Sequence, residues 1–133
     1  LGANIECNPK NLLDFTIMGA SLYKSLYPNE IPKVALLNIG TEELKGNEVI
    51  KETYKSLMSK QNNNFNFEGY IEGNELMNGQ VNVVVSDGFT GNIALKTAEG
   101  TANFITGELK KALGGNIVGK ISSLLKNLKF KKI

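Results

Sequence analysis

Short apolar runs alternate along the chain with segments whose apolar residues recur at helical spacing. Residues 33–40, KVALLNIG, and residues 81–86, VNVVVS, are almost wholly apolar. Such runs are typical of strands that are buried on both faces of a parallel sheet. Phe65, Phe67 and Tyr70 mark a further strand between them. Strands that alternate with helices predict an α/β fold with a parallel sheet.

The first helical segment has clear boundary signals at both ends. Asn8 is a good N-cap residue, Pro9 suits the first helical position, and Tyr27-Pro28-Asn29 ends the pattern. The apolar positions of this helix are Leu12, Phe15, Met18, Leu22 and Leu26. A second helix begins at Asn47, and its apolar positions are Ile50, Tyr54, Leu57 and Met58. A short helical turn is expected around residues 75–77.

A long third helix is predicted after the last strand. Its apolar positions are Leu95, Ala98, Ala102, Ile105, Leu109 and Leu113. Gly114-Gly115 is expected to break this helix, and a last amphipathic segment follows. We therefore divide the chain into an α/β part, residues 1–113, and a helical segment, residues 114–133.

Composition narrows the chemistry that the 133 residues can perform. The chain lacks histidine, which excludes Ser-His and Cys-His catalytic pairs and histidine-based zinc sites within it. It also lacks arginine, so phosphate can meet only lysine charges and backbone amides. The single cysteine, Cys7, excludes an internal disulfide and suits a reducing cytoplasm. No apolar run is long enough to predict a membrane-spanning helix.

Two loops have the position and composition of ligand-binding loops. They are NIGTEELKGNE, residues 38–48, and SDGFTGN, residues 86–92, and each joins a buried strand to a helix N-terminus. Ligands of parallel sheets bind at the carboxyl ends of the strands, and helix N-termini favour anions. A purely structural interpretation remains open, in which Gly88 and Gly91 supply backbone angles and Thr90 or Asn92 caps the helix.

Three separated stretches closely resemble the bacterial phosphate acyltransferase family of phospholipid synthesis. They are GANIECNPKNLLDFTIMG, LLNIGTEELKGNE and EGYIEGNELMNGQVNVVVSDGFTGNIALKTAEG, in the order that the family has them. The resemblance extends from about residue 2 to residue 110. Family proteins are over twice this length, so the chain is expected to be an internal or C-terminal fragment. The resemblance also implies a sandwich similar to isocitrate and isopropylmalate dehydrogenases and phosphate acetyltransferase.

The resemblance implies a reaction and assigns residues to it. The family transfers a fatty acyl group from acyl carrier protein to inorganic phosphate, in the cytoplasm and as a homodimer, and no cofactor or metal is expected. Lys45, Gly46 and Asn47 fall in one active-site loop, and Asn4 is expected nearby. The residues implied for the second loop are Asp87, Gly88, Thr90, Gly91 and Asn92.

This reaction needs no histidine, because phosphate is already an anionic nucleophile at neutral pH. Lys45 is expected to attract phosphate as a point charge. Asn92 is expected to donate a hydrogen bond to phosphate or to the developing oxyanion of the thioester. Asp87 is expected to orient Asn92 or Lys45, since a carboxylate in contact with phosphate would be repulsive. The alternative function is that of a non-catalytic fragment that binds an anion or a lipid surface.

The charge is divided along the chain, although the net charge is only +2. Residues 1–108 carry eight lysines and thirteen acids, whereas residues 109–133 carry seven lysines and no acid. The tail has the pattern of a basic amphipathic helix, which favours anionic membrane or acidic acyl carrier protein. Packing on the core or on a dimer partner is the alternative, and nucleic acid is not favoured. The candidate contact residues are Lys120, Leu124, Leu125, Lys126, Leu128 and Lys129.

Overall fold

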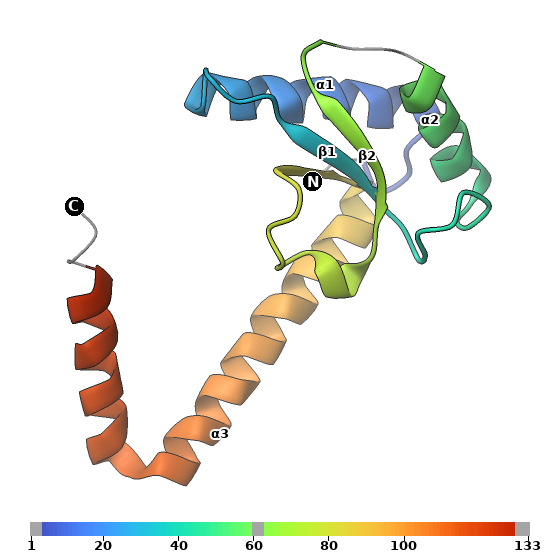
Figure 1. The fold of residues 1–133 in the computed structure, drawn as a ribbon. Helices are drawn as coiled ribbons and strands as arrows, with labels where there is room; N and C mark the ends of the chain where they lie inside the picture. Colours follow the sequence, from blue (N-terminus) through green and yellow to red (C-terminus); the bar gives the residue numbers. More distant parts are fainter. Residues whose placement is uncertain (1–3, 60–62, 130–133) are drawn as a thin grey trace. The chain divides into compact units, whose positions relative to one another are not determined.

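The computed structural model describes residues 4–59 and 63–129, in which a small sheet is followed by a long helix (Figure 1). The elements before the last strand are α1 (Pro9–Leu26), β1 (Lys33–Leu37), α2 (Glu48–Ser59), β2 (Asn66–Ile71) and the single-turn η1 (Gly73–Glu75). β3 (Val83–Val85) and α3 (Gly88–Lys129) complete the described chain. The predicted order of helices and strands is therefore confirmed as far as α3, and β1 and β3 are shorter than predicted.

The three strands form one parallel sheet in the order β2-β1-β3. Val34 pairs with Phe67 on one side of β1 and with Val83 on the other. β1 is the central strand, and its residues Val34–Leu37 are all buried, as expected for a parallel sheet covered on its faces. The predicted α/β class with a parallel sheet is thus confirmed.

α1 begins as the sequence predicts but buries a different face. Asn8 caps the helix by accepting a hydrogen bond from the Asn11 N–H at 2.9 Å, and Pro9 occupies the first turn. The buried residues of the helix are Leu12, Thr16 and Ala20. Three of the predicted apolar positions, Met18, Leu22 and Leu26, are instead exposed.

The small residues of α1 explain which face packs against the sheet. A Cβ atom added at Gly19 would lie 2.7 Å from Val83 Cγ1, so α1 approaches β3 closely only because this position is glycine. Thr16 satisfies its buried hydroxyl by donating to the Leu12 carbonyl at 2.9 Å. Hydrophobic spacing alone therefore misidentifies the buried face, because close packing selects small side chains there.

The core lies between the sheet and the two helices that contact it. α1 and α2 contact each other, α1 contacts β1 and β3, and α2 contacts β2. Aromatic rings extend the core at β2, where Tyr54 lies 4.6 Å from Tyr70 and 5.5 Å from Phe67 between ring centroids. The buried apolar residues of this core include Leu12, Ala20, Val34, Leu36, Ile50, Leu57, Phe65, Tyr70 and Val85.

The helical backbone of α3 continues through Gly114 and Gly115, so the predicted break there is wrong. Glycine costs only about 1 kcal/mol in a helix, which neighbouring helix formers can offset. The structure divides into two compact units, residues 1–94 and 95–133. The two units are defined by the contacts within each of them, which does not test a domain boundary. The predicted boundary at residue 113 therefore stays a prediction.

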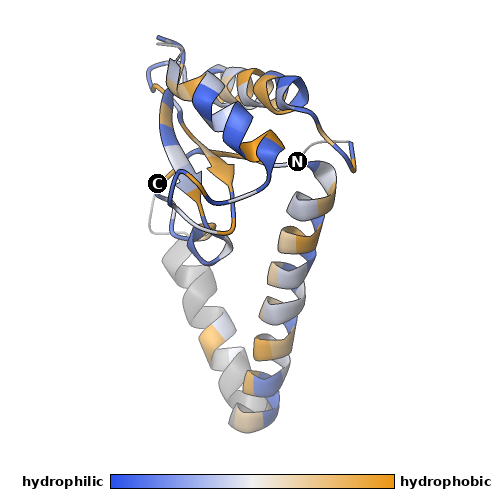
Figure 2. Ribbon diagram, turned by 90° about the vertical axis from the view of Figure 1, so that its right-hand side faces the viewer, coloured by the Kyte–Doolittle hydropathy of each residue, from blue (hydrophilic) through white to orange (hydrophobic). Residues whose placement is uncertain are grey.

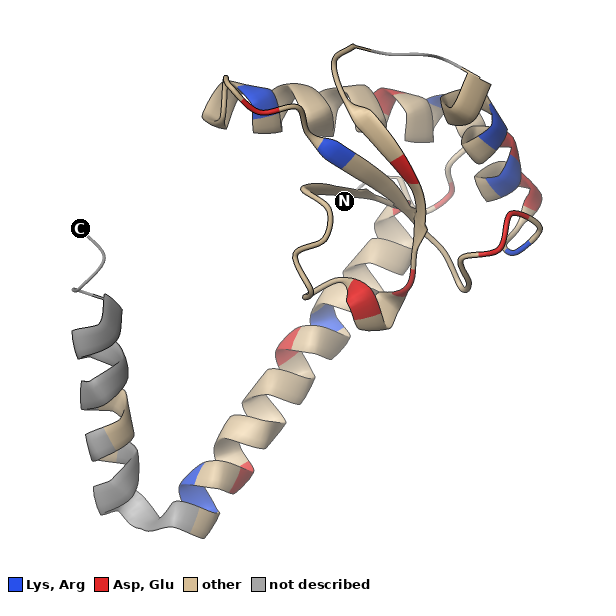
Figure 3. Ribbon diagram, in the orientation of Figure 1, with Lys and Arg blue, Asp and Glu red and all other residues tan. Residues whose placement is uncertain are grey.

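Hydrophobic and polar positions alternate along the first part of α3 (Figure 2). Several of its large apolar side chains are exposed, namely Phe89, Ile93, Leu95, Phe104, Ile105, Leu109 and Ile121. Charges of both signs lie on α2 and on the loops (Figure 3). Among the described residues, none of the helices combines the length and the hydrophobicity that a membrane span requires.

Candidate functional site

The loops at the carboxyl ends of β1 and β3 lead directly into the N-termini of α2 and α3. Residues 38–47 connect β1 to α2, and Ser86-Asp87 connects β3 to α3. In a parallel sheet these ends share one edge, which is where ligands bind. The two loops that the sequence analysis singles out therefore meet at the expected edge.

Asn38 holds the loop between β1 and α2 in shape. Its side-chain amide donates to the Lys45 carbonyl at 3.1 Å, and the Lys45 N–H donates to the Glu42 carbonyl at 2.9 Å. Gly46 follows with φ +94°, and a Cβ atom there would lie 2.5 Å from Asn38 Oδ1. Only glycine fits this position without strain. The Lys45 side chain is exposed.

Asn47 acts as the cap of α2. Its side-chain Oδ1 accepts from the Ile50 N–H at 2.9 Å, and its carbonyl accepts from the Lys51 N–H at 3.1 Å. Glu48 in the first turn pairs with Lys51 at 2.9 Å. The hydrogen bond and the charge of Lys51 lower the pKa of the Glu48 carboxyl. The helix start is therefore rigidly defined, and Asn47 is engaged in forming it.

Asp87 plays the same part at α3. Its two carboxylate oxygens accept from the Thr90 N–H at 2.6 Å and from the Thr90 hydroxyl at 2.8 Å. Asp87 is therefore the cap, and not Thr90 or Asn92 as the structural interpretation held. The expected role of Asp87 in orienting Asn92 or Lys45 stays a prediction, and in this structure both carboxylate oxygens accept from Thr90.

The segment before α1 is attached to the start of α3. The Gly88 N–H donates to the Asn4 carbonyl at 2.8 Å, and Cys7 Sγ donates to the same carbonyl at 3.6 Å. Asn4 therefore lies beside the second loop, where the resemblance implies it. Burial raises the pKa of the Cys7 thiol, the charge of Asp87 raises it further, and a hydrogen bond from the Gly88 backbone opposes this.

Residues of these three segments line an open cavity of about 370 Å³. Of the predicted site residues, Asn47, Asp87 and Thr90 line it. Gly46, Gly88 and Gly91 lie in the same turns of the backbone, whereas Lys45 and Asn92 do not line the cavity. The side chain of Asn92 is exposed on α3. The complete lining consists of Ile5, Glu6, Cys7, Leu12, Asn47, Val49, Ile50, Asp87, Phe89 and Thr90.

Three polar or thiol residues in or beside the site were not predicted as site residues from the sequence, and neither were the apolar lining residues Ile5, Leu12, Val49, Ile50 and Phe89. Asn38 forms the β1–α2 loop, and Glu6 and Cys7 line the cavity. A polar residue directly after an apolar run was the available signal for Asn38. For Glu6 and Cys7 no local pattern existed, because their place follows from the contact between residues 4–7 and α3.

The candidate membrane or carrier contacts of the tail have helical backbone, but their side chains lie outside the part that the structure describes. These residues are Lys120, Leu124, Leu125, Lys126, Leu128 and Lys129. Their role stays a prediction. Residues 130–133, with the last two lysines, lie wholly outside the described residues.

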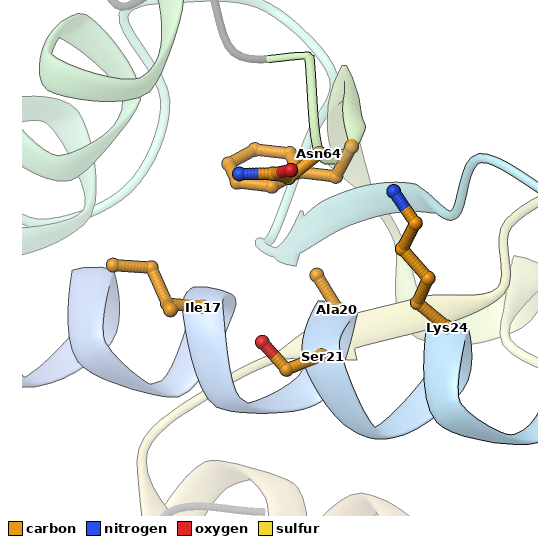
Figure 4. A pocket seen from close by; sticks show the side chains of 6 residues that line it. Ile17, Ala20, Ser21, Lys24 and Asn64 are labelled. Carbon is orange, nitrogen blue, oxygen red and sulfur yellow. The ribbon is translucent and has the colours of Figure 1, made fainter. Parts of the chain in front are cut away.

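A second cavity lies near the amino-terminal end of β2, away from the β1–α2 and β3–α3 loops (Figure 4). It has a volume of about 290 Å³, and Lys24 is the charged residue that lines it. Its other lining residues are Ile17, Ala20, Ser21, Asn64 and Phe65. Ligands of parallel sheets bind at the opposite edge, so this cavity is not the primary candidate.

Comparison with known proteins gives a consistent result over the whole chain. A sequence profile described as "Fatty acid synthesis protein" matches residues 1–133. A curated "Phosphate acyltransferase" from Pelagibacter ubique is 74% identical over 132 residues, which cover 99% of this chain and 40% of that protein. Proteins of the same name from Maricaulis maris and Neisseria meningitidis serogroup A are 45% and 42% identical, over 96% and 98% of this chain.

The matched region is only a part of each relative. It covers 36% of the Maricaulis protein and 38% of the Neisseria protein. The chain therefore spans about two fifths of the length of the curated relatives that it matches.

Proposed function

This chain belongs to the fatty acid synthesis protein family, and we propose that it supplies part of the active site of a phosphate acyltransferase. The proposed reaction moves a fatty acyl group from acyl carrier protein to inorganic phosphate, which gives an acyl phosphate. The name of the relatives, phosphate acyltransferase, supports the transfer of an acyl group and the use of phosphate as a substrate. The carrier protein is part of the proposal.

One structural observation carries the proposal. Residues from three distant parts of the chain, at positions 5–12, 47–50 and 87–90, line one open cavity at the carboxyl edge of the sheet. Each of the three stretches that resemble the family supplies residues to this lining, and Val49 and Ile50 follow directly after the second stretch. Ligands of open parallel sheets bind at this edge, which supports the proposal.

The proposed chemistry is direct transfer. A phosphate oxygen attacks the thioester carbonyl carbon, the carbon–sulfur bond breaks, and the thiolate leaves and takes a proton from water. Lys45, exposed on the β1–α2 loop, attracts the phosphate as a point charge. Asn92, exposed on α3, donates to the phosphate or to the oxyanion of the carbonyl. Positioning of the two reactants supplies much of the acceleration.

Asp87 has a positioning role in this proposal. Its carboxylate fixes the first turn of α3 through Thr90 and so sets where Asn92 emerges from the helix. The N–H and O–H of Thr90 hold the carboxylate at the first turn of α3, and in this proposal phosphate approaches from the side of Lys45. Gly46, Asn47, Gly88 and Gly91 shape the backbone of the two turns.

We further propose that the protein acts as a homodimer with a sandwich fold similar to the dehydrogenases named above. Apolar side chains of α3 are exposed, with Phe104 at 68% and Leu109 at 52%. Exposed apolar residues are typical of surfaces that contact another protein, which supports the proposed dimer. Localisation in the cytoplasm and contact with anionic membrane belong to the same proposal.

The test uses a chimaera in which these 133 residues replace the matching region of the Pelagibacter relative. The chimaera, with acyl carrier protein loaded with a fatty acid, should form acyl phosphate that hydroxylamine traps, and only when phosphate is present. The 133 residues alone should fold but turn over poorly, because three fifths of the relative is missing. A folded chimaera that forms no acyl phosphate, while the parent relative does, would favour the non-catalytic alternative.

A further inference from the structure

The cavity at the carboxyl edge of the sheet is divided between an apolar floor and a polar rim. Leu12 and Ile50 are almost fully buried, at 1% and 8% exposure, and the half-buried Val49 joins them. Ile5 and Phe89 add apolar walls that remain exposed to solvent, at 72% and 58%. The rim carries Glu6, Cys7, Asn47, Asp87 and Thr90.

The charges of the rim argue against phosphate inside this cavity. Glu6 and Asp87 are both acidic, and none of the residues that line the cavity is a lysine. Glu6 has no ion pair among the described residues. Two carboxylates beside a phosphate would repel it, even though two helix N-termini lie close by. An uncharged ligand meets no such penalty.

The size of the cavity limits what it can take. At about 370 Å³ it lies at the small end of ligand cavities, which span roughly 300–1,000 Å³. Val49 and Phe89 are the second residues of α2 and α3, where backbone N–H groups have no intrahelical acceptor. A ligand with one neutral carbonyl and a short apolar stretch therefore matches both the rim and the floor.

We propose that this cavity holds the carbonyl end and the first carbons of the acyl chain, while phosphate approaches from outside it, on the side of Lys45. This inference rests on the proposed function and adds the place where the acyl group lies. The carbonyl lies at the rim, near the first turns of α2 and α3, and the chain points to Leu12, Val49 and Ile50. The two rim carboxylates keep the phosphate group, both as the free reactant and as part of the acyl phosphate product, outside the cavity.

The only cysteine of the chain provides a built-in reporter, because Cys7 lines the cavity. We would measure the rate at which N-ethylmaleimide labels Cys7 at alkaline pH, by mass spectrometry. N-ethyloctanamide, an unreactive neutral carbonyl compound with an eight-carbon acyl chain, is the probe. N-ethylacetamide tests whether binding needs the long acyl chain. Octanoate tests whether binding needs an uncharged carbonyl group in place of a carboxylate. Each compound is used below its micelle concentration.

N-ethyloctanamide should slow labelling about tenfold at ten times its dissociation constant. N-ethylacetamide should not protect at the same concentration, since each fully buried methylene strengthens binding about fourfold. Octanoate should protect less than the amide, because its carboxylate meets Glu6 and Asp87. Equal protection by octanoate and by the amide, or no protection by either, would overturn the proposal.

Variants distinguish binding of the amide in the cavity from nonspecific binding elsewhere on the protein. Ile5→Ser should weaken protection several-fold, whereas the matched control Ile31→Ser, also an exposed isoleucine but outside the cavity, should not. Val49→Phe should fill the cavity and abolish protection, with thermal unfolding measured to confirm that the variant folds. Unchanged protection in both Ile5→Ser and Val49→Phe would show that the amide binds elsewhere, and would also overturn the proposal.

Failure of this cavity proposal can be told apart from failure of the proposed function. Acyl phosphate formation by the chimaera without protection of Cys7 would remove this cavity from the acyl site and leave the proposed reaction intact. Protection of Cys7 without acyl phosphate formation would leave an acyl-binding cavity in a protein that performs a different reaction.

Discussion

Asp87 has two possible roles, as the cap of α3 and as a residue of the candidate site. The sequence places it directly after a buried strand and before glycine, a position that suits a helix cap as well as a ligand-binding residue. The structure shows that both carboxylate oxygens are used by Thr90. Capping therefore explains the residue without any ligand, and its effect on chemistry is indirect.

Replacing Asp87 by alanine should lower the free energy of unfolding by about 1 kcal/mol, because the Thr90 N–H loses its acceptor. Asp87→Asn should retain most of the stability, since an amide oxygen also caps. Urea denaturation measures both, with Asp14→Ala, an exposed acid within α1, as the control. Equal stability of Asp87→Ala and the control would contradict the cap.

Gly46 and Gly79 offer a matched pair for the β1–α2 loop. Both have positive φ, +94° and +69°, but a Cβ atom at Gly46 would meet the Asn38 side chain, whereas nothing lies within 4 Å at Gly79. Gly79→Ala should cost about 1 kcal/mol of unfolding free energy, and Gly46→Ala about 2 kcal/mol or more. Chemical denaturation would refute this account if the two variants were equally stable.

At the scale of elements, the boundaries of α1 were predictable and its packing was not. Asn8 and Pro9 are local signals, and the structure confirms them. The buried face depends on how closely α1 approaches β3, which Gly19 permits and which no local pattern records. The fold class was predictable for the same reason as the helix start, because the alternation of apolar runs and helical patterns is itself local.

The candidate site was predictable only in part. The two loops were identified because each follows an apolar run and precedes a helical pattern. The capping of α2 by Asn47 and of α3 by Asp87 depends on backbone geometry that the sequence does not fix. The place of Cys7 depends on a contact between residues about eighty positions apart along the chain.

The end of α1 has a titratable hydrogen bond. The Tyr23 hydroxyl donates to Glu30 Oε2 at 2.6 Å, and this bond, with smaller contributions from burial and from the charge of Glu30, raises the pKa of Tyr23 to about 12. Since the pKa of Tyr23 in the folded protein exceeds the ordinary tyrosine value of 10.0, the stabilisation is present below pH 10 and is lost as the pH rises to about 12.

Tyr23→Phe should therefore remove one late phenolate transition from the absorbance titration of the folded protein. The stability difference between wild type and variant should be constant below pH 10 and shrink above it. Tyr70→Phe is the control for stability below pH 10, because its buried hydroxyl has no partner among the described residues and its removal should cost no stability there. Burial also raises the pKa of Tyr70, so this variant is not a control for the titration. An unchanged late transition in Tyr23→Phe would contradict the assigned hydrogen bond.

At the scale of the whole molecule, the chain combines an acidic α/β part with a basic, apolar helix. The chain spans about two fifths of the relatives that it matches. α3 exposes large apolar side chains such as Ile105 and Leu109. Exposed apolar residues of this kind are typical of a helix that packs against a binding partner. Such a partner could be a second copy, the rest of a longer protein, or a membrane surface.

Anionic vesicles test the membrane partner. We expect the chain to sediment with anionic vesicles at low salt and to be released at high salt, because each lysine contributes about 1 kcal/mol that salt screens. Leu124→Glu should weaken this binding, and neutral vesicles should bind little. If the chain ignores anionic vesicles at low salt, the basic helix is a packing element.

The central claim is that the two helix-entry loops of this chain bring phosphate to an acyl group. Its most direct test is the steady-state kinetics of acyl phosphate formation by the chimaera, with phosphate varied. Lys45→Ala should raise the KM for phosphate about tenfold to a hundredfold, as expected for a lost charge-assisted contact, and Asn92→Ala should lower kcat about 10²–10³-fold. The control Lys55→Ala, an exposed lysine on α2, should change neither constant. Constants for Lys45→Ala and Asn92→Ala that match those of Lys55→Ala would contradict the claim.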